Sequence, residues 1–402
     1  MLDDMQNISN KKDNPGDELC ILDYPISKKA NHTDSTRYKI IKLESDDLFY
    51  KWESYVERHP EAHIFDHPLW FKALESEYNR KGCVLASLDK YENINGVLPL
   101  LPTIGLPLKL GDLVTTRRYS SLPRSPLGGL IADNEDVKKA LLDEAIRRVD
   151  SRDKTFLQLK SYSPDINDKN SQIQKVPWRS SYICNLPEDP TKIRFGDKKH
   201  HHRVKWAVNK ARKLGIKVRQ ANSEEDIKKW YELYLRTMRW HVVAARPFRF
   251  FRFLWENLQP KGLMTVLLAE IEDENSKQLL SGSFFLHFNN IFFYSFNGRC
   301  QEGLVSHAND LIQWEAIHLA AEMGYKHYDM GEVSSSNESL AHFKTKWGCC
   351  TKPVYHYYYP LRDEMKKKEI DISEDVKLRK IIWRKVPLYV TQHWGILTNR
   401  FL

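Results

Sequence analysis

What this sequence lacks excludes several classes of protein. No apolar run approaches the roughly 18 residues that a membrane-spanning helix needs, because Pro99, Pro102 and Pro107 interrupt the most apolar stretch. The N-terminus, MLDDMQNISNKKDN, has no apolar core of the kind found in secretory signals. Glycine (17) and proline (18) are too few for a fibrous or low-complexity chain of 402 residues.

Cysteine is scarce and scattered. The six cysteines include no C-x-x-C pair, so there is no zinc-ribbon or thioredoxin motif. We expect free thiols in a reducing compartment, which favours a cytoplasmic protein. No G-x-S-x-G, Walker A, H-E-x-x-H or G-x-G-x-x-G motif occurs. Serine-nucleophile chemistry, P-loop phosphoryl transfer and dinucleotide redox chemistry are therefore disfavoured.

The chain is moderately basic, with a formal net charge of +9. This excess indicates an anionic partner without choosing between nucleic acid, a membrane surface and an acidic substrate. Residues 198–219 hold nine Lys or Arg and no acid, and one face of the helix predicted there carries Arg203 and Lys205. Such a face suits phosphate contacts, although a solvated basic face explains the same pattern.

The chain contains a repeated order of elements. Residues 1–37 are polar and lack periodicity, so we expect a flexible tail. From residue 38 the pattern predicts a strand, two helices, antiparallel strands, a helix and a strand, and the second half repeats that order. The repeat predicts an α+β fold of two similar domains, at 38–180 and 181–360, followed by a basic, aromatic segment at 361–402.

One predicted helix, at 306–323, has clear signals at both ends. Ser306 is a suitable N-cap, and Gly324 is suited to a left-handed position after the last turn. The preceding loop, 297–304, has two glycines and no R-x-x-G-x-G/A signature. An intact pyrophosphate loop for coenzyme A is therefore not expected at this helix.

Three further clusters are candidate sites. His59, His63 and His67 have helical spacing, but Pro60 and Pro68 break the helix, so we expect no metal site. Arginines in the Pro/Ser/Gly-rich loop, Arg124 among them, suit an anionic substrate, although this pattern alone favours an ordinary ordered loop. A polar loop follows the strand that ends at 329–331, and loops at strand ends often form sites.

Five stretches, HPLW (67–70), SSLPRSPLGG (120–129), RVKWAVNKARKLGIKV (203–218), IQWEAIHLAAEMGYKHYDMG (312–331) and HFKTKWG (342–348), together resemble one enzyme family. The sequence is similar to Fem-type (FemAB/FemX) peptidoglycan-bridge aminoacyltransferases and to related BioF2-like acyltransferases of the GNAT superfamily, over about residues 38–360. The resemblance implies two tandem GNAT-like domains. It also implies transfer of an amino acid from aminoacyl-tRNA to an amine on a peptidoglycan precursor.

The resemblance also assigns roles to individual residues. Arg203 matches the arginine that opens a basic pattern in the family, and is implied to meet substrate phosphate. Lys344 matches the lysine of a Phe-Lys pair at the family's reaction centre, and Asp329 matches a strand-end aspartate. Trp70 matches a family tryptophan, but Leu74 stands where a lysine often follows it. The chain also has no long helical hairpin of the kind that some members insert for tRNA.

Acyl transfer of this type needs no enzyme nucleophile, only alignment, proton removal and oxyanion stabilisation. We expect Lys344 and Asp329 to be the catalytic residues. Lys344 and backbone N–H groups between Tyr294 and Asn297 would stabilise the oxyanion, while Asp329 would orient the attacking amine. The predicted substrate-binding residues are Trp70, Arg124, Arg203, Lys205, Tyr294, Asn297 and Phe343.

The donor and acceptor remain open at this stage. We expect aminoacyl-tRNA or acyl-CoA as donor substrate, no separate cofactor, and an envelope or lipid-linked precursor as acceptor. One alternative is an acyl-CoA-dependent N-acyltransferase of the same fold. Another is a non-enzymatic module that binds RNA or another anionic polymer through the basic helix. No stable protein partner is predicted.

The C-terminal residues 376–402 are basic and rich in Trp, Tyr and aliphatic side chains. Pro387 interrupts the segment, so it is too short to cross a bilayer. It is either a terminal helix packed on the second domain or an interfacial segment that contacts anionic lipid. The second alternative would place the protein peripherally at the inner face of the membrane.

Overall fold

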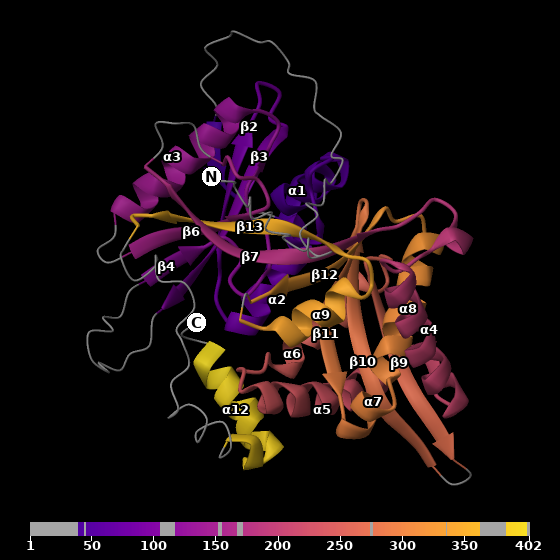
Figure 1. Ribbon diagram of the computed structural model, residues 1–402. Coiled ribbons are helices and arrows are strands. Elements are labelled where there is room, and N and C mark those ends of the chain that lie inside the picture. The colour runs from indigo at the N-terminus through magenta and orange to yellow at the C-terminus, as the bar shows by residue number, and fades with distance from the viewer. Residues whose placement is uncertain are drawn as a thin grey trace, which may run out of the picture.

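One large mixed sheet, flanked by helices, runs through the molecule (Figure 1). The computed structural model describes residues 39–43, 46–104, 117–151, 155–166, 172–273, 276–334, 336–361 and 383–399. The expected tail at 1–37 and the stretch at 362–382 lie outside these residues. Within them, no helix has both the length and the apolar character needed to span a membrane.

The first half of the chain starts with a strand and two helices, as predicted. Pro68 occupies the first turn of α2, where a backbone N–H would have no partner within the helix, so the N–H that proline lacks is not needed. The side chain of Asn134 accepts a hydrogen bond from the Val137 N–H and caps α3. The elements are β1 (Lys39–Lys42), α1 (Asp46–Arg58), η1 (Ile64–Asp66), α2 (Pro68–Tyr78), β2 (Cys83–Leu88), β3 (Ile94–Ile104), β4 (Arg117–Ser120), β5 (Ile131–Ala132), α3 (Glu135–Asp150) and β6 (Thr155–Ser161).

The second half repeats this order after an additional helix. Asp197 caps α4 and Ser223 caps α5, each through its side-chain oxygen. The elements are η2 (Pro190–Lys192), α4 (Lys198–Lys213), β8 (Lys217–Gln220), α5 (Glu224–His241), α6 (Phe248–Leu258), β9 (Met264–Asp273), β10 (Ser276–Phe288), β11 (Ile291–Arg299), α7 (Gln301–Val305), α8 (Ala308–Glu322), β12 (His327–Val333) and α9 (Glu338–Thr345).

The two halves share one topology. The strand order is β1-β2-β3-β4-β6 in the first half and β8-β9-β10-β11-β12 in the second. In each, the last pair is parallel, β4 with β6 and β11 with β12, while the preceding pairs are antiparallel. The predicted repeat and the α+β class are thus confirmed, with both halves part of one sheet.

Two exchanged strands, β7 (Gln174–Asn185) and β13 (Cys350–Tyr359), join the halves. β7 follows β6 in the chain but pairs with β12, whereas β13 follows the second half but pairs with β6. The two also pair with each other across the middle of the sheet (Figure 1). The boundary expected at residues 180/181 falls inside β7, and the domain limits stay a prediction.

A disulfide in this region corrects the expectation of free thiols. Cys184 on β7 is bonded to Cys349, which directly precedes β13. The antiparallel register sets Cys350 opposite Ile183 and so brings Cys184 beside Cys349. The two cysteines are 165 residues apart in the chain. Only the strand exchange, which spacing does not reveal, makes them neighbours.

The helix expected at 306–323 is divided in the structure. α7 ends at Val305, and α8 begins after His307, whose backbone is left-handed (φ 61°). Because that conformation interrupts the helix, Ser306 is not the N-cap of α8, which corrects the sequence prediction. At the other end, Gly324 is left-handed (φ 82°), as predicted.

A shared apolar core holds the halves together. It includes Trp52 and Trp70 from α1 and α2, and Trp230, Phe250 and Phe251 from α5 and α6. Each fully buried side chain of this size contributes about 1.5–3 kcal/mol or more. Separate cores lie under α3 in the first half and under α4 and α8 in the second.

The C-terminal helix α12 (Leu388–Asn399) packs against α5. Arg239 on α5 donates a hydrogen bond to the Val386 carbonyl, 2.8 Å away. Leu388 packs against the shared core, and Thr391 is buried. This placement matches the expected alternative of a terminal helix on the second half.

Candidate active site

A cavity of about 830 Å³ lies where the two halves meet. Strands β6, β7 and β13 and the loop at 121–129 form one side of it, and β11, β12 and α9 form the other. Substrate sites often occupy cavities of this size between domains.

The cavity opens where β11 and β12 separate. Their parallel pairing ends at Phe293 and Asp329. Beyond that point Tyr294 and Ser295 on β11, and Met330 on β12, line the cavity. Ser295 is also the extra residue of a bulge against β10. Backbone groups that the two strands no longer share are available to a ligand.

In the first half the matching gap is filled by the chain itself. The parallel pairing of β4 with β6 ends at Ser120 and Gln158. The loop at 121–129 then lies against β6: its first N–H donates to the Gln158 carbonyl at 2.8 Å, and Gly128 bridges to Lys160. The repeat therefore contains one open gap and one closed gap.

Side-chain hydrogen bonds hold this plug loop, residues 121–129, in place. Lys160 Nζ donates to the Ser125 carbonyl at 2.7 Å, and Trp70 Nε1 donates to the Ser125 hydroxyl at 2.8 Å. Leu122 and Arg124 both adopt left-handed backbone (φ 58° and 57°), so the turn is tight. The loop thus forms a fixed wall of the cavity.

A bulge in β12 brings two carboxylates to the cavity. Asp329 lies opposite Ile183 and Glu332 lies opposite Ser181, so three steps on β12 match two on β7. Gly331 takes up the difference in a left-handed conformation (φ 79°). In a regular strand, residues three apart would face opposite sides, but here Asp329 and Glu332 both line the cavity.

Asp329 is almost fully buried and accepts three hydrogen bonds. Tyr162 Oη and Ser181 Oγ donate to its two oxygens at 2.5 and 2.6 Å, and the Gly331 N–H donates at 2.7 Å. These bonds tie β12 to β7 and to the residue after β6. Asp329 is therefore well suited to fixing the shape of the bulge.

Lys344 on α9 reaches the same bulge. Its Nζ donates to the carbonyls of Gly331 and Glu332 at 2.8 and 3.1 Å, which uses two of its three N–H bonds. Burial lowers the pKa of Lys344 to about 8, although the charges of Asp329 and Glu332 oppose the shift. The ammonium is thus charged at neutral pH and lines the cavity.

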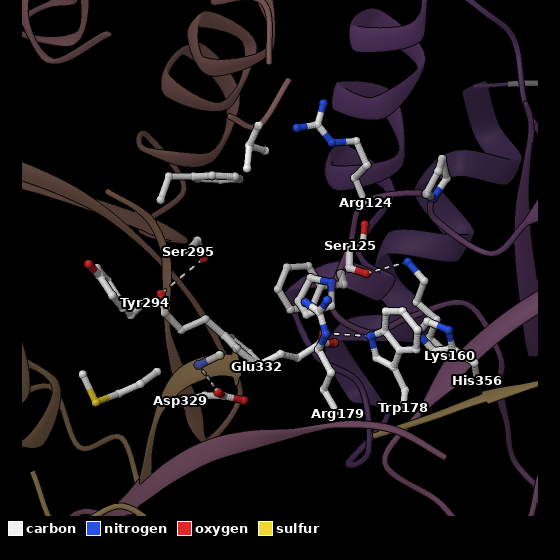
Figure 2. Close-up of a pocket in the computed structure, with 18 of the residues that line it drawn as sticks. Arg124, Ser125, Lys160, Trp178, Arg179, Tyr294, Ser295, Asp329, Glu332 and His356 are labelled. Atoms are coloured by element: carbon white, nitrogen blue, oxygen red, sulfur yellow. Dashed lines mark hydrogen bonds between the residues drawn. The ribbon is translucent and has the colours of Figure 1, made fainter. Parts of the chain in front are cut away.

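Glu332 lies in the middle of the cavity (Figure 2), between Asp329 on one side and Trp178 and Lys160 on the other. Trp178 Nε1 donates to its Oε2 at 3.2 Å. Burial raises the pKa of the Glu332 carboxyl against the opposing charges of Lys160 and Arg179. Burial also lowers the pKa of Lys160 to about 7. A carboxyl group with a raised pKa and an ammonium group with a lowered pKa both favour proton transfer near neutral pH.

An aromatic wall stands beside this pair. The rings of Trp178 and His356 stack with centroids 4.3 Å apart. Burial, with a smaller effect from nearby cations, lowers the pKa of His356 to about 3, so the imidazole is neutral at pH 7. The Tyr358 hydroxyl and the Gln158 amide lie within hydrogen-bond reach of His356. This wall offers a flat surface to one substrate.

The structure brings together six of the nine residues singled out from the sequence. Arg203 and Lys205 do not line the cavity; both are exposed on α4, which packs against α8. Phe343 lies next to Lys344 in the chain but packs against Trp347. Those that line the cavity are Trp70, Arg124, Tyr294, Asn297, Asp329 and Lys344.

Arg124 and Asn297 make polar contacts within the protein. Arg124 pairs with the buried Glu77 at 3.2 Å and donates to the Ala244 carbonyl at 2.8 Å. The Asn297 amide donates to Ser283 Oγ and Asn309 Oδ1. Their observed contacts position the cavity walls.

Sequence reasoning missed Glu332, Lys160, Trp178, Arg179 and His356. Glu332 directly follows the Asp-Met-Gly strand end that the sequence had marked, so that motif was a usable signal one residue away. The other four lie on β6, β7 and β13. They meet only through the strand exchange, and no local pattern indicates it.

The three histidines at 59, 63 and 67 do not converge. His63 Nδ1 contacts Asp66 at 2.8 Å, and His67 Nε2 contacts Glu53 at 3.4 Å. Among the described residues, Glu53, Glu57 and His67 are near enough to share a cation, but Glu53 is already paired with Lys261.

Comparisons with known proteins agree with this geometry. Residues 198–345 match the acetyltransferase (GNAT) domain family. The crystal structure of FemX matches with a TM-score of 0.60 and 14% identity, over 81% of this chain and 98% of that one. The C-terminal domain of a putative lysylphosphatidylglycerol synthetase from Agrobacterium fabrum matches with a TM-score of 0.52 and 9% identity, over 80% and 94%. No curated protein matches the sequence.

A conserved protein of unknown function from Bacteroides thetaiotaomicron has the same fold, with a TM-score of 0.52, 13% identity and coverage of 80% and 98%. The matched region spans α4 to α9, which includes the separated strands β11 and β12 and the bulge between Asp329 and Glu332. Acyl transfer is accordingly the supported class of reaction. Residues 198–345 are thus similar to the acetyltransferase (GNAT) domain family, and the chain shares its fold with FemX.

Proposed function

We propose that the protein transfers an aminoacyl group from aminoacyl-tRNA, or another acyl group, to an amine of an anionic cell-envelope precursor. One observation carries the proposal: Glu332 and Lys344 meet at the point where β11 and β12 separate. A base and a cation there lie beside backbone groups that a carbonyl substrate can reach.

The charge of the cavity supports an anionic substrate. Its described lining includes five cationic side chains and two carboxylates, Asp329 and Glu332. His356 is neutral because its pKa is about 3. Phosphate-bearing substrates include tRNA, coenzyme A and lipid-linked or nucleotide-linked precursors. The cationic residues are Arg118, Arg124, Lys160, Arg179 and Lys344.

In the proposed reaction the acceptor amine attacks the carbonyl carbon of an ester or thioester. The C–N bond forms, and the carbonyl oxygen becomes an oxyanion that Lys344 and backbone N–H groups near Tyr294 stabilise. Glu332 takes the proton that the amine loses. The C–O or C–S bond then breaks, and the leaving oxygen or sulfur receives the proton that Glu332 took from the amine. Asp329 holds the bulge on which Glu332 stands.

Two findings favour an aminoacyl donor and an envelope acceptor. The structural match to FemX agrees with the sequence resemblance to Fem-type aminoacyltransferases. The lysylphosphatidylglycerol synthetase domain is named after an aminoacylated phospholipid. For a lipid-linked acceptor, the segment at 376–402 would provide the peripheral contact with the inner face of the membrane.

A second candidate is transfer from acyl-CoA. The family match to acetyltransferase domains favours this donor. Against it, residues 297–304 have no pyrophosphate signature, and the helix that follows β11 directly is the five-residue α7.

A two-label assay separates these candidates. Full-length protein is incubated with tRNA charged with ³H-labelled amino acids, ¹⁴C-acetyl-CoA and a peptidoglycan precursor that carries a free amine, in nucleotide-linked and lipid-linked forms. Tritium in the acceptor supports aminoacyl transfer, and ¹⁴C supports the second candidate. If tRNA binds but neither label moves, the protein is a binding module and the proposal is wrong.

The role of Glu332 is tested in the same assay. Glu332→Gln keeps the shape but removes the base, so we expect turnover to fall about 10²–10⁴-fold. Glu338→Gln, on the exposed first turn of α9, is the matched control and should retain activity. Equal activity in the two variants would exclude Glu332 as the base.

A further inference from the structure

Large apolar side chains are exposed at the C-terminal ends of α5 and α7 and along α12. Trp240 and Trp394 are each 51% exposed, Tyr389 is 65% exposed and Val305 is 66% exposed. Isolated exposed apolar residues are ordinary, but a contiguous group marks an interaction surface. We call this group the aromatic face: Trp240, Val242, Val243, Leu304, Val305, Tyr389 and Trp394.

Side-chain contacts connect these elements. Arg384 lies 4.1 Å from the centre of the Trp240 ring, and the neighbouring Trp383 contacts the ring of Trp394. Leu304 and Trp240 line one pocket. Figure 1 shows α5, α7 and α12 along the lower edge of the molecule, with α12 in yellow beside α5. These contacts connect Trp240 and Leu304 with Trp394, so α5, α7 and α12 form one edge of the molecule.

An arginine pocket opens in this face. It has a volume of about 460 Å³, and its lining includes Arg236, Arg239 and Arg299, with Glu302 as the one carboxylate among the described residues. Within the described chain these three arginines form no ion pair within 4 Å. Burial lowers the pKa of His241 in the same wall, and the charges of Arg299 and Arg384 lower it further, as a locally positive potential requires.

The aromatic face is continuous with the mouth of the central cavity. Val242 and Val243 are exposed directly after α5, and Val243 and Ala244 also line the cavity. The exposed Leu340 of α9 lines the cavity as well. A molecule held at the aromatic face thus lies next to the entrance of the candidate active site.

We propose that the aromatic face docks on an anionic phospholipid surface, with a lipid phosphate in the arginine pocket and Trp240, Tyr389 and Trp394 at headgroup level. Trp and Tyr side chains are favoured at this depth, and arginines are drawn to anionic headgroups. The purpose of this docking rests on the proposed function. A lipid-linked acceptor would reach the cavity directly from the membrane plane.

Vesicle co-sedimentation of the full-length protein tests the docking. One set of vesicles is pure phosphatidylcholine, and the other contains 30% phosphatidylglycerol. We expect at least tenfold stronger partition onto the anionic vesicles, weakened by 0.5 M salt. Trp240→Ser/Trp394→Ser and Arg236→Gln/Arg299→Gln should each reduce partition at least tenfold. Wild-type protein that stays in the supernatant with both vesicle types would overturn the proposal.

Matched controls make the test specific. Tyr50→Ser/Tyr91→Ser removes aromatics that are 69% and 72% exposed elsewhere, and Arg203→Gln/Lys205→Gln removes two exposed charges on α4. Both should bind anionic vesicles as the wild type does. Equal losses in test and control variants would mean that net charge or general stickiness, not this face, drives binding.

Two further measurements complete the design. Circular dichroism and thermal unfolding establish that each variant is folded, and the aromatic and arginine pairs test the face independently. Sedimentation velocity without vesicles detects the competing occupant, a second copy of the chain. If the aromatic variant changes self-association but not vesicle binding, the docking proposal is wrong. The vesicles contain no donor or acceptor, so a protein inactive in the transfer assay can still pass this test.

Discussion

At the scale of single residues, Lys344 is expected to make the rate of the reaction depend on pH. Its pKa of about 8 means that the ammonium loses its charge as the pH rises through that value. If it stabilises the oxyanion, kcat must fall on the alkaline side of pH 8. We expect Lys344→Ala to lower turnover about 10²–10³-fold. In Lys344→Arg the charge persists, so the alkaline decline should move to higher pH. A pH–rate profile of Lys344→Arg identical to that of the wild type would contradict this role.

The charge of Glu77 has a structural role. Its carboxylate is fully buried and pairs with both Arg124 and Arg246, and so links α2 to the turn between α5 and α6. Glu77→Ala would leave two guanidinium groups without their buried partner. We expect the free energy of unfolding in urea to fall by about 3–5 kcal/mol. The exposed Glu57→Ala should change it by no more than about 0.5 kcal/mol. A loss below about 1 kcal/mol in Glu77→Ala would show that the pair contributes little.

At the scale of elements, the bulge in β12 controls where Glu332 lies. A methyl group at Gly331 would make only ordinary van der Waals contacts, with Lys344 Nζ at 3.9 Å and the Tyr294 carbonyl oxygen at 4.0 Å, so the cost of Gly331→Ala is the left-handed backbone. We expect about 1–2 kcal/mol of lost stability. We also expect turnover to fall tenfold or more, because relaxation of the bulge moves the carboxylate.

Gly324→Ala is the matched control for this substitution. Gly324 has nearly the same φ, 82°, with no atom within 4 Å of the added methyl group, and it lies after α8. It should show the same loss of stability in chemical denaturation but normal turnover. Equal turnover in the two variants would mean that the bulge does not position a catalytic group.

Element order was predictable from the sequence, whereas the site was predictable only in part. Strands such as β9 and β10 and helices such as α5 have periodic apolar residues, and these are local signals. Asp329 and Lys344 were found through a resemblance in short motifs. Lys160, Trp178 and His356 have no local signal, because β6, β7 and β13 come together only in the folded sheet. The Cys184–Cys349 pair was missed for the same reason.

At the scale of the whole molecule, the strand exchange makes each half depend on the other. β6 needs β13 as its neighbour, and β12 needs β7. The matched family, at 198–345, includes neither exchanged strand. We expect fragments 1–172 and 190–402, expressed separately, to aggregate, because each exposes an unpaired strand edge. The measurement is size-exclusion chromatography with urea unfolding.

The control for the fragments is the chain ending at residue 361, which keeps every strand of the described sheet and loses α12. It should remain monomeric and unfold in one cooperative transition. A monodisperse, cooperatively unfolding 190–402 fragment would show instead that the second half is an independent folding unit.

The plug loop affects how such a protein can evolve. Two equivalent halves would form two reaction clefts. Here the loop at 121–129 fills the cleft of the first half. Because the first cleft is filled, the plug loop does not have to support a second reaction. Mutations in the loop nevertheless change the wall that faces Glu332 across the remaining cavity. This wall can therefore change while the wall formed by β11, β12 and α9 stays the same. Under the proposed function, changes confined to this one loop would alter which substrates fit the cavity.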